Sequence, residues 1–411
     1  MNKPLILRNR DFLLLWTSQV LSQAGNRMFQ IAVSWWIISQ VSESSGLYLA
    51  IFMVLGALPA IILVKKIGMV VDRYSSRQVL LTSDVLGGIF ACLLIASMMG
   101  EPVFSLILIS GMIFAFFQGF IEPTLNKAVP ELVDEVDIGP AVAFLSSTQT
   151  LANFAGAVLG AIFIEEFGLI GVTLINGGSY LFSAVCDSLI RFRQAPKSKE
   201  EAGESGRLSG WALLKDKPLI KKILITFGCV NLFGTPILVI LPLYTKHVLK
   251  ASASVLGGLE ACVWVGILLG TFGTSLFGLK NKTFLFTGLC LSTFALFLSL
   301  PGFGAEVAFY GFCLFGAGFS LGAMNVRIVS FFQMVIANEH KGRFFSLLQA
   351  LISFAIPIGY FGFAYLSDFI AIQKLCFIQG AGVAILALVF IYYSRDESAL
   401  RSYIKAEGEK S

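Results

Sequence analysis

Apolar runs of about twenty residues recur along the whole chain, and they constrain its fold more than any other feature. A helix needs about 20 apolar residues to cross the roughly 30 Å of hydrocarbon in a bilayer. The composition agrees, because 56% of the residues are hydrophobic and 13% are charged. The runs are continuous rather than alternating, which excludes a membrane β-barrel. We therefore expect an all-α membrane protein with twelve transmembrane helices near residues 12–38, 46–64, 78–99, 103–122, 140–164, 168–190, 219–243, 252–276, 283–301, 305–326, 344–366 and 371–394.

The basic residues indicate how these helices are oriented. When successive loops are assigned alternately to the two sides, 26 of the 30 Lys and Arg residues fall on the side that holds both ends of the chain. Lys246, Lys250 and Lys374 fall on the other side, and Arg27 lies inside the first run. Because basic loops stay in the cytoplasm, both termini are expected to be cytoplasmic. The opposite loops are acidic, with Glu43, Glu101, Glu165, Glu166, Glu306 and Asp368.

Several functions are excluded by residues that the sequence lacks. The net charge of +5 reflects membrane orientation, so no nucleic-acid partner is expected. The seven cysteines show no C-x-x-C spacing, and His247 and His340 lie in loops on opposite sides, so no disulfide framework and no metal site are expected. The chain has no G-x-x-x-x-G-K-[ST] motif and no Ser/His/Asp arrangement. We expect neither an enzyme nor a bound cofactor.

A polar stretch divides the chain into two similar halves. We predict an amino-terminal six-helix bundle at 1–190, a cytoplasmic linker at 191–218, a carboxy-terminal six-helix bundle at 219–395 and a cytoplasmic tail at 396–411. A shift of 205 residues places Asn26 on Asn231 and Glu122 on Arg327. Six helices lie between equivalent points, so both halves enter the membrane in the same direction, as in transporters with parallel repeats. Two similar bundles can rock about a central site, as alternating access requires.

A charged motif lies between the second and third helices. The segment "GMVVDRYSSR" (68–77) resembles the G-x-x-x-D-R-x-x-[RK]-[RK] signature of the major facilitator superfamily through Gly68, Asp72, Arg73 and Arg77. Ser75 and Ser76 replace a usual glycine and a usual basic residue, and the equivalent loop of the second half has Phe277 at the aspartate position. The resemblance covers nearly the whole chain and implies the two-bundle fold of that superfamily.

Within the superfamily, four segments are similar to the macrolide-efflux branch, which lies near bacterial siderophore exporters: "GNRMFQIAVSWWI", "VVDRYSSRQVLLTSDVL", "EPTLNKAVPELV" and "KGRFFSLLQALISFAIPIG". This resemblance implies a monomeric exporter of the bacterial inner membrane that exchanges a small amphiphilic or drug-like compound for protons. The proton gradient is then the energy source. Two alternatives stay open: an exporter of an anionic metabolite such as a siderophore, and an uncoupled facilitator, receptor or lipid scramblase.

The first helix carries polar residues inside an apolar run. An ionisable side chain at this depth costs about 2.5–3.5 kcal/mol and usually faces a cavity or a partner. Helical spacing places Gln19, Gln23, Asn26, Arg27 and Gln30 on one stripe. In the superfamily this helix lines the central cavity, so we predict substrate-binding roles for Gln23, Asn26, Arg27 and Gln30, with Asn231 contributed by the other half. The alternative is a structural ion pair or a snorkelling arginine.

Glu260 is a second ionisable residue inside an apolar run. A carboxyl group in a low dielectric can gain and lose a proton near neutral pH, so Glu260 is the predicted proton-coupling residue. A permanent polar partner is the alternative.

The charged motif predicts a conformational latch made of Gly68, Asp72, Arg73 and Arg77. A carboxylate beside a helix amino terminus is stabilised by the helix dipole, and the two arginines lie at the anionic leaflet. Asp84, two turns into the third helix, is expected to neutralise one of these arginines from below. The alternative is that these basic residues lie on a tight turn and only orient the chain in the membrane.

Opposite charges at the repeat-related positions Glu122 and Arg327 predict an inner gate. The alternative is that each residue pairs locally, Glu122 with Lys127 and Arg327 with Glu339.

The fifth helix carries small residues in a pattern similar to one seen in antiporters of the superfamily. They predict close helix packing: Ala152, Gly156, Ala157, Gly160 and Ala161.

Overall fold

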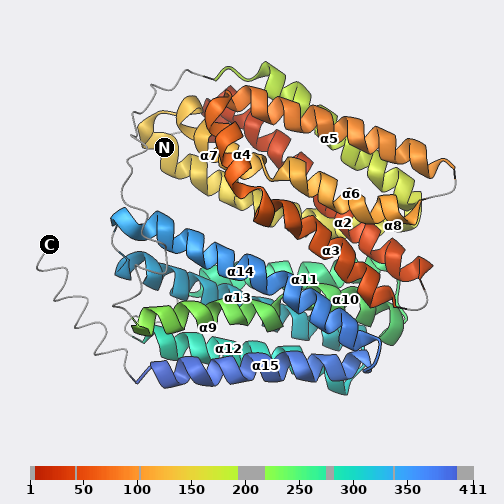
Figure 1. The fold of residues 1–411 in the computed structure, drawn as a ribbon, viewed down its shortest axis with the longest axis vertical. Coiled ribbons are helices and arrows are strands. Elements are labelled where there is room, and N and C mark those ends of the chain that lie inside the picture. Colours follow the sequence, from red (N-terminus) through yellow and green to blue (C-terminus); the bar gives the residue numbers. More distant parts are fainter. Residues whose placement is uncertain are drawn as a thin grey trace, which may run out of the picture. The chain divides into compact units, whose positions relative to one another are not determined.

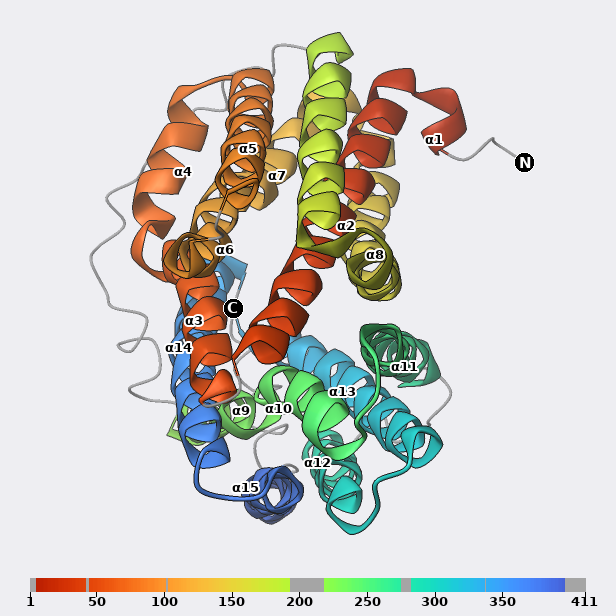
Figure 2. The same ribbon diagram turned by 90° about the vertical axis from the view of Figure 1, so that its right-hand side faces the viewer.

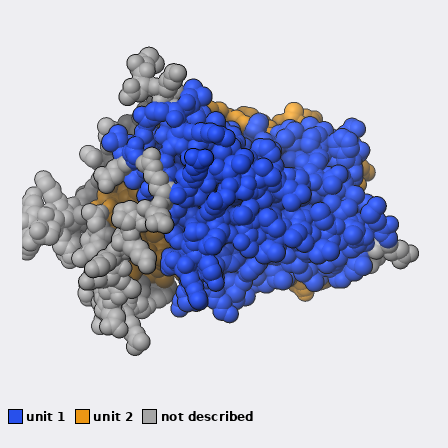
Figure 3. All heavy atoms as spheres, turned by 90° about the horizontal axis from the view of Figure 1, so that it is seen from above, with its two compact units in different colours: residues 1–203, 252–258 blue, residues 204–251, 259–411 orange. Residues whose placement is uncertain are grey.

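The computed structural model describes residues 5–41, 44–100, 103–192, 218–274, 282–336 and 338–395. Within these ranges the regular elements are helices, and no strand occurs (Figure 1). The chain divides into two compact units, shown in separate colours in Figure 3. Unit 1 comprises residues 1–203 and 252–258, and unit 2 comprises residues 204–251 and 259–411. The predicted linker and tail lie mostly outside the described residues.

Unit 1 contains the helices of the first half of the chain. They are α1 (Leu5–Arg8), α2 (Arg10–Gln40), α3 (Ser45–Ile62), α4 (Val64–Arg73), α5 (Ser76–Met98), α6 (Phe104–Gln118), α7 (Ile121–Leu132), the 3-10 turn η1 (Glu135–Asp137) and α8 (Ile138–Leu189). Both α2 and α5 pack along α8, as Figure 2 shows. Unit 1 also includes the first turns of α11.

Unit 2 contains most of the second half. Its helices are α9 (Pro218–Gly234), α10 (Ile237–Leu243), the π-helical turn η3 (Tyr244–Val248), α11 (Ala253–Gly273), α12 (Thr283–Ser299), the 3-10 turn η5 (Leu300–Phe303), α13 (Val307–Val335), α14 (Asn338–Ser367) and α15 (Ile372–Tyr393). An aromatic core joins α12, α13 and α15 through Phe284, Phe331, Phe332 and Phe390. Glycines also allow α11 to approach α13 closely; a Cβ at Gly270 would lie 2.0 Å from the Phe319 carbonyl oxygen.

The described helices confirm the predicted all-α membrane architecture. Ten helical segments are long and apolar enough to cross a membrane. The long α8 combines two predicted spans, and Gly168 interrupts it with φ +63° and ψ −173°, a backbone conformation that suits glycine. The more polar α2 is not among the ten, although it has 31 residues. Counting α2 and both parts of α8 gives the predicted number of spans.

Large apolar side chains lie exposed on the outer faces of these helices. Leu93 on α5, Val185 on α8 and Leu388 on α15 are each more than half exposed. Exposed rows of this kind suit a hydrocarbon environment, where the backbone groups are satisfied within each helix. The spans also differ from the predicted ones at their ends. The fourth continues through α7 to Leu132, and the seventh continues through the π-helical turn to Val248.

Candidate functional site: polar groups inside two helical units

The polar residues of α2 point in two directions. Gln23 Nε2 lies 3.5 Å from Gln19 Oε1, and Arg27 Nη1 donates to Gln30 Oε1 at 3.0 Å, on a partly exposed face. Asn26 is instead turned into unit 1, where its Oδ1 accepts a hydrogen bond from the Tyr180 hydroxyl at 2.8 Å. The structure therefore groups Arg27 with Gln23 and Gln30, and it separates Asn26 from them.

Close packing by α8 fixes the position of Arg27. A Cβ at Gly156 would lie 2.6 Å from the Arg27 Cβ and 2.8 Å from the Ala24 carbonyl oxygen. One turn later, a Cβ at Gly160 would lie 2.7 Å from the Met28 Cα. Ala152, Ala157 and Ala161 are fully buried. The small-residue pattern thus brings α8 against the backbone of α2 on both sides of the arginine, as predicted for close packing.

Unit 2 contains a cavity of about 130 Å³ that includes two predicted site residues. Asn231 on α9 and Glu260 on α11 both line it. Glu260 is 4% exposed, and the Trp264 Nε1 lies 3.5 Å from its Oε1. The other lining residues are largely apolar, including Val230, Leu238, Val263, Ile267 and Phe294. The cavity therefore combines an apolar wall with an amide, an indole and a buried carboxyl group, a combination typical of small-molecule sites.

The charged motif forms the turn between α4 and α5. Ser75 caps α5, and its side chain and that of Gln78 form a reciprocal capping box. Lys127 of α7 donates to the carbonyl oxygens of Val71 and Tyr74, each at 2.7 Å, and so caps the end of α4. The predicted local pair of Lys127 with Glu122 is therefore replaced by a contact with this turn.

The predicted latch residues lie around this turn. Asp72 is exposed on the last turn of α4, rather than at a helix amino terminus. The Arg73 guanidinium lies 5.8 Å from the Tyr74 ring centroid, and Arg77 donates to the carbonyl oxygen of Ser188. Gly68 has open space around it, so nothing in the structure requires a glycine there.

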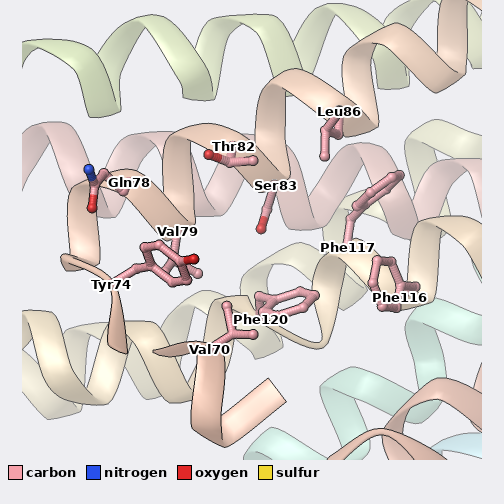
Figure 4. A pocket seen from close by; sticks show the side chains of 10 residues that line it. All are labelled: Val70, Tyr74, Gln78, Val79, Thr82, Ser83, Leu86, Phe116, Phe117 and Phe120. Carbon is pink, nitrogen blue, oxygen red and sulfur yellow. The ribbon is translucent and has the colours of Figure 1, made fainter. Parts of the chain in front are cut away.

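A second cavity, of about 330 Å³, lies beside the same turn (Figure 4). Val70 and Tyr74 line one side, Thr82 and Ser83 of α5 line another, and Phe120 lies between α6 and α7. None of the predicted substrate-binding residues lines it.

Asp84 is placed differently from the expectation. It is fully buried, and it forms no ion pair with Arg73 or Arg77. Its neighbours are Ser183 and Asp187 of α8, and Asp187 is fully buried too. Sequence reasoning missed Asp187, although an aspartate inside the apolar run 168–190 is itself a signal.

The two gate residues belong to different units. Glu122 is exposed on the first turn of α7 in unit 1. Arg327 of α13 in unit 2 is partly buried, with its guanidinium carbon 5.1 Å from the Phe286 ring centroid. Their proposed pairing stays a prediction, and the side chain of Glu339 lies outside the described residues.

Comparison with known proteins connects these sites to transport. The chain is 22% identical over 385 residues to macrolide efflux protein A of Streptococcus pyogenes, covering 92% of this chain and 94% of that protein. It is 25% identical over 333 residues to the putative bacilysin exporter BacE of Bacillus subtilis (strain 168), covering 79% of this chain and 80% of that protein.

Solved transporter structures share the fold. The nucleoside transporter NupG matches with a TM-score of 0.74 at 12% identity, over 93% of this chain and 99% of that one. A bacterial homologue of the iron transporter ferroportin matches with a TM-score of 0.72 at 16% identity, over 94% of this chain and 98% of that one. The model of the Major Facilitator Superfamily matches residues 15–337. The twelve spans, the motif turn and this match together establish that the chain is a multi-pass membrane transporter, not an enzyme, and belongs to the Major Facilitator Superfamily.

Proposed function

We propose that the protein exports a small amphiphilic compound from the cytoplasm in exchange for protons, by alternating access. The single observation that carries the proposal is the cavity of unit 2, where the buried Glu260 carboxyl group lines the same apolar space as Asn231 and Trp264. The names of the macrolide-efflux and bacilysin-exporter relatives support the outward direction and an organic substrate.

The cavity of unit 2 suggests how substrate and proton compete. A buried carboxyl group costs several kcal/mol when ionised, so it favours either a proton or a bound cationic or hydrogen-bonding group. Asn231 and the Trp264 indole orient a polar group of the substrate, and the apolar wall accommodates its hydrocarbon part. Release of the substrate then leaves Glu260 to take up a proton, which couples the two movements.

Arg27 favours a second candidate, the export of an anionic compound. Its guanidinium lies on the partly exposed face of α2 with Gln30, where it offers donors to a carboxylate. A siderophore or another acidic metabolite is the substrate class that such a site binds best. An uncoupled facilitator, receptor or lipid scramblase remains the alternative without coupling.

The remaining features of the proposal follow from the charge pattern and from the family. The protein functions in the bacterial cytoplasmic membrane as a monomer, with both termini in the cytoplasm. The excess of basic residues in the loops on that side supports this orientation.

Flux in proteoliposomes tests the proposal. The purified protein is reconstituted with a pH-sensitive dye in the lumen, and labelled macrolide and labelled acidic siderophore are compared under an imposed pH gradient. We expect substrate movement against its own gradient, coupled to proton movement in the opposite direction and abolished by a protonophore. Equal flux with and without the pH gradient would indicate a facilitator, and no flux of either compound class would contradict export of these substrates.

A further inference from the structure

Two carboxyl groups lie side by side within unit 1, and neither lines the cavity of unit 2. Asp84 is on α5, about two turns from its first residue, and Asp187 is on the last turn of α8. Both side chains are fully buried, and the two carboxyl groups are neighbours. No oxygen of either group forms a standard hydrogen bond among the described residues. Such a pair is unusual in a membrane bundle, and the proposed transport chemistry does not use it.

A buried hydroxyl group lies beside these acids. Ser183, one turn before Asp187 on α8, is fully buried and close enough to Asp84 to interact with its carboxyl group, although no hydrogen bond of standard geometry satisfies its Oγ among the described residues. Ser18 of α2 lies next to Asp187. Buried polar groups are normally satisfied, so these gathered oxygens require a donor between them, and a proton on one of the two carboxyl groups would supply it.

The basic side chains of the surrounding helices are engaged elsewhere. Arg77 of α5 donates to the Ser188 carbonyl oxygen, and Arg27 of α2 donates to Gln30. Lys127 of α7 donates to the two carbonyl oxygens at the end of α4. The helix α6 has no ionisable residue. Among the described residues of unit 1, no basic side chain forms an ion pair with either carboxyl group.

Tyr180 and Cys186 of α8 are the ionisable side chains that interact with the pair, and neither carries a positive charge. These groups cannot compensate two negative charges. Two carboxylates that share a buried site cannot both be ionised, since like charges add to the cost of desolvation.

We propose that Asp84 and Asp187 together bind one proton, and that they form a second proton site of the transporter. The inference rests on the proposed proton-coupled function for its role, but the site itself is defined by the structure of unit 1. A metal ion fits less well, because calcium takes 6–8 oxygen ligands and the described residues contain no group of three or more acidic, histidine or cysteine ligands.

A polar seam connects this pair with the polar residues of α2. Tyr180, one turn before Ser183, donates to Asn26, and the Gln118 Nε2 lies 3.4 Å from the Tyr180 hydroxyl. The side chains of Ser22 and Asn176 are buried in the same contact between α2 and α8. Tyr180 also interacts electrostatically with Asp84, so the charge of the acid pair acts on the residue that holds Asn26.

Infrared spectroscopy of the purified protein in lipid tests the site without any substrate or flux. The C=O stretching band of a protonated carboxylic acid is recorded at neutral pH in a background with Glu131→Gln and Glu260→Gln, which removes the other buried carboxyl groups of the described residues. We expect a band that Asp84→Asn and Asp187→Asn each abolish or shift. The exposed Asp368 provides the matched control, and Asp368→Asn should leave the band unchanged.

The possible outcomes distinguish a shared proton from a metal site and from two independent carboxyl groups. A missing band in the correctly folded background protein, or a band unchanged in both variants, would overturn the shared proton. Saturable binding of sodium or calcium that is lost in both variants would replace it with a metal site. If the variants do not fold, Asp84→Glu and Asp187→Glu replace them, because each retains a carboxyl group and should shift the band rather than abolish it. Proton-driven export by a protein that lacks the band would disprove the shared proton but leave the proposed function standing. A band in a protein that does not export would disprove the proposed function but leave the shared proton standing.

Discussion

At the residue scale, the surroundings of the Glu260 carboxyl group support its proposed role in proton coupling. The carboxyl group is almost fully buried beside an indole and lines an apolar cavity together with an amide. Because the carboxyl group lines the cavity, a polar group of a bound substrate can contact it directly.

Glu260→Gln should uncouple transport from the pH gradient. The amide retains the shape of the side chain but cannot exchange a proton, so export against a gradient is lost while exchange of substrate across the membrane continues. Flux with and without an imposed pH gradient measures this difference. Trp264→Phe is the control that removes the indole donor and keeps the carboxyl group; full coupling in the Glu260→Gln protein would contradict the assignment.

Arg27→Ala should reduce transport to the level of empty liposomes while membrane insertion stays normal. The arginine stem packs against Gly156, and its guanidinium contacts Gln30 on the partly exposed face of α2. Arg27→Lys retains the charge but loses the planar donor pair, so it should retain activity with weaker substrate binding. Wild-type flux in the alanine variant would remove Arg27 from the site.

The direction in which a single polar side chain of α2 points could not be predicted from the sequence. Helical spacing predicted one polar stripe on α2, but neighbouring positions differ by about 100° around a helix, so Asn26 and Arg27 face different surroundings. Only the position of Tyr180, far away in the sequence, shows that Asn26 belongs to the interior of unit 1. The acid pair was missed for the same reason, since Asp84 and Asp187 are far apart in sequence and meet only through the packing of α5 on α8.

At the element scale, the apolar runs and the motif could be predicted because they are local. Spans of about twenty residues and the turn between α4 and α5 follow from hydropathy and capping chemistry, and both are present in the structure. The continuation of the fourth span through α7 could not be predicted from hydropathy. That helix depends on tertiary contacts, including the bonds from Lys127 to the end of α4.

Gly156→Ala should destabilise unit 1 by roughly 1–3 kcal/mol, the usual cost of overpacking. The added methyl group would meet the Ala24 carbonyl oxygen and the Arg27 side chain within 3 Å, so α2 and α8 must separate. Thermal unfolding in detergent measures the effect. Gly178→Ala on the same helix is the matched control, because its Cβ would meet nothing within 4 Å. Equal melting temperatures for the two variants would show that the contact tolerates a methyl group.

At the scale of the whole molecule, alternating access requires a feature that favours one conformation without stabilising the fold as such. Ser75, Gln78 and Lys127 hold the turn between α4 and α5 through local hydrogen bonds. Asp72 takes part in none of the described hydrogen bonds and is exposed on the carboxy-terminal turn of α4, where the helix dipole disfavours a negative charge. Because the Asp72 carboxylate does not stabilise its own turn, its charge is suited to act on the equilibrium between the outward-open and inward-open states.

Asp72→Asn should therefore not lower thermal stability, because it removes a charge that the helix dipole disfavours, but it should shift the population toward the inward-open state and slow turnover. The change removes a charge and retains the shape, so any effect comes from electrostatics. Asn126→Cys on α7, introduced into a protein without native cysteines, reports accessibility from the side that we propose to be cytoplasmic, because Asn126 is exposed. A membrane-impermeant maleimide should label it faster in the Asp72→Asn protein than in the parent or in the Asp368→Asn control. Equal labelling rates, together with normal flux, would show that Asp72 does not hold the conformational equilibrium and that the motif serves only to orient the chain.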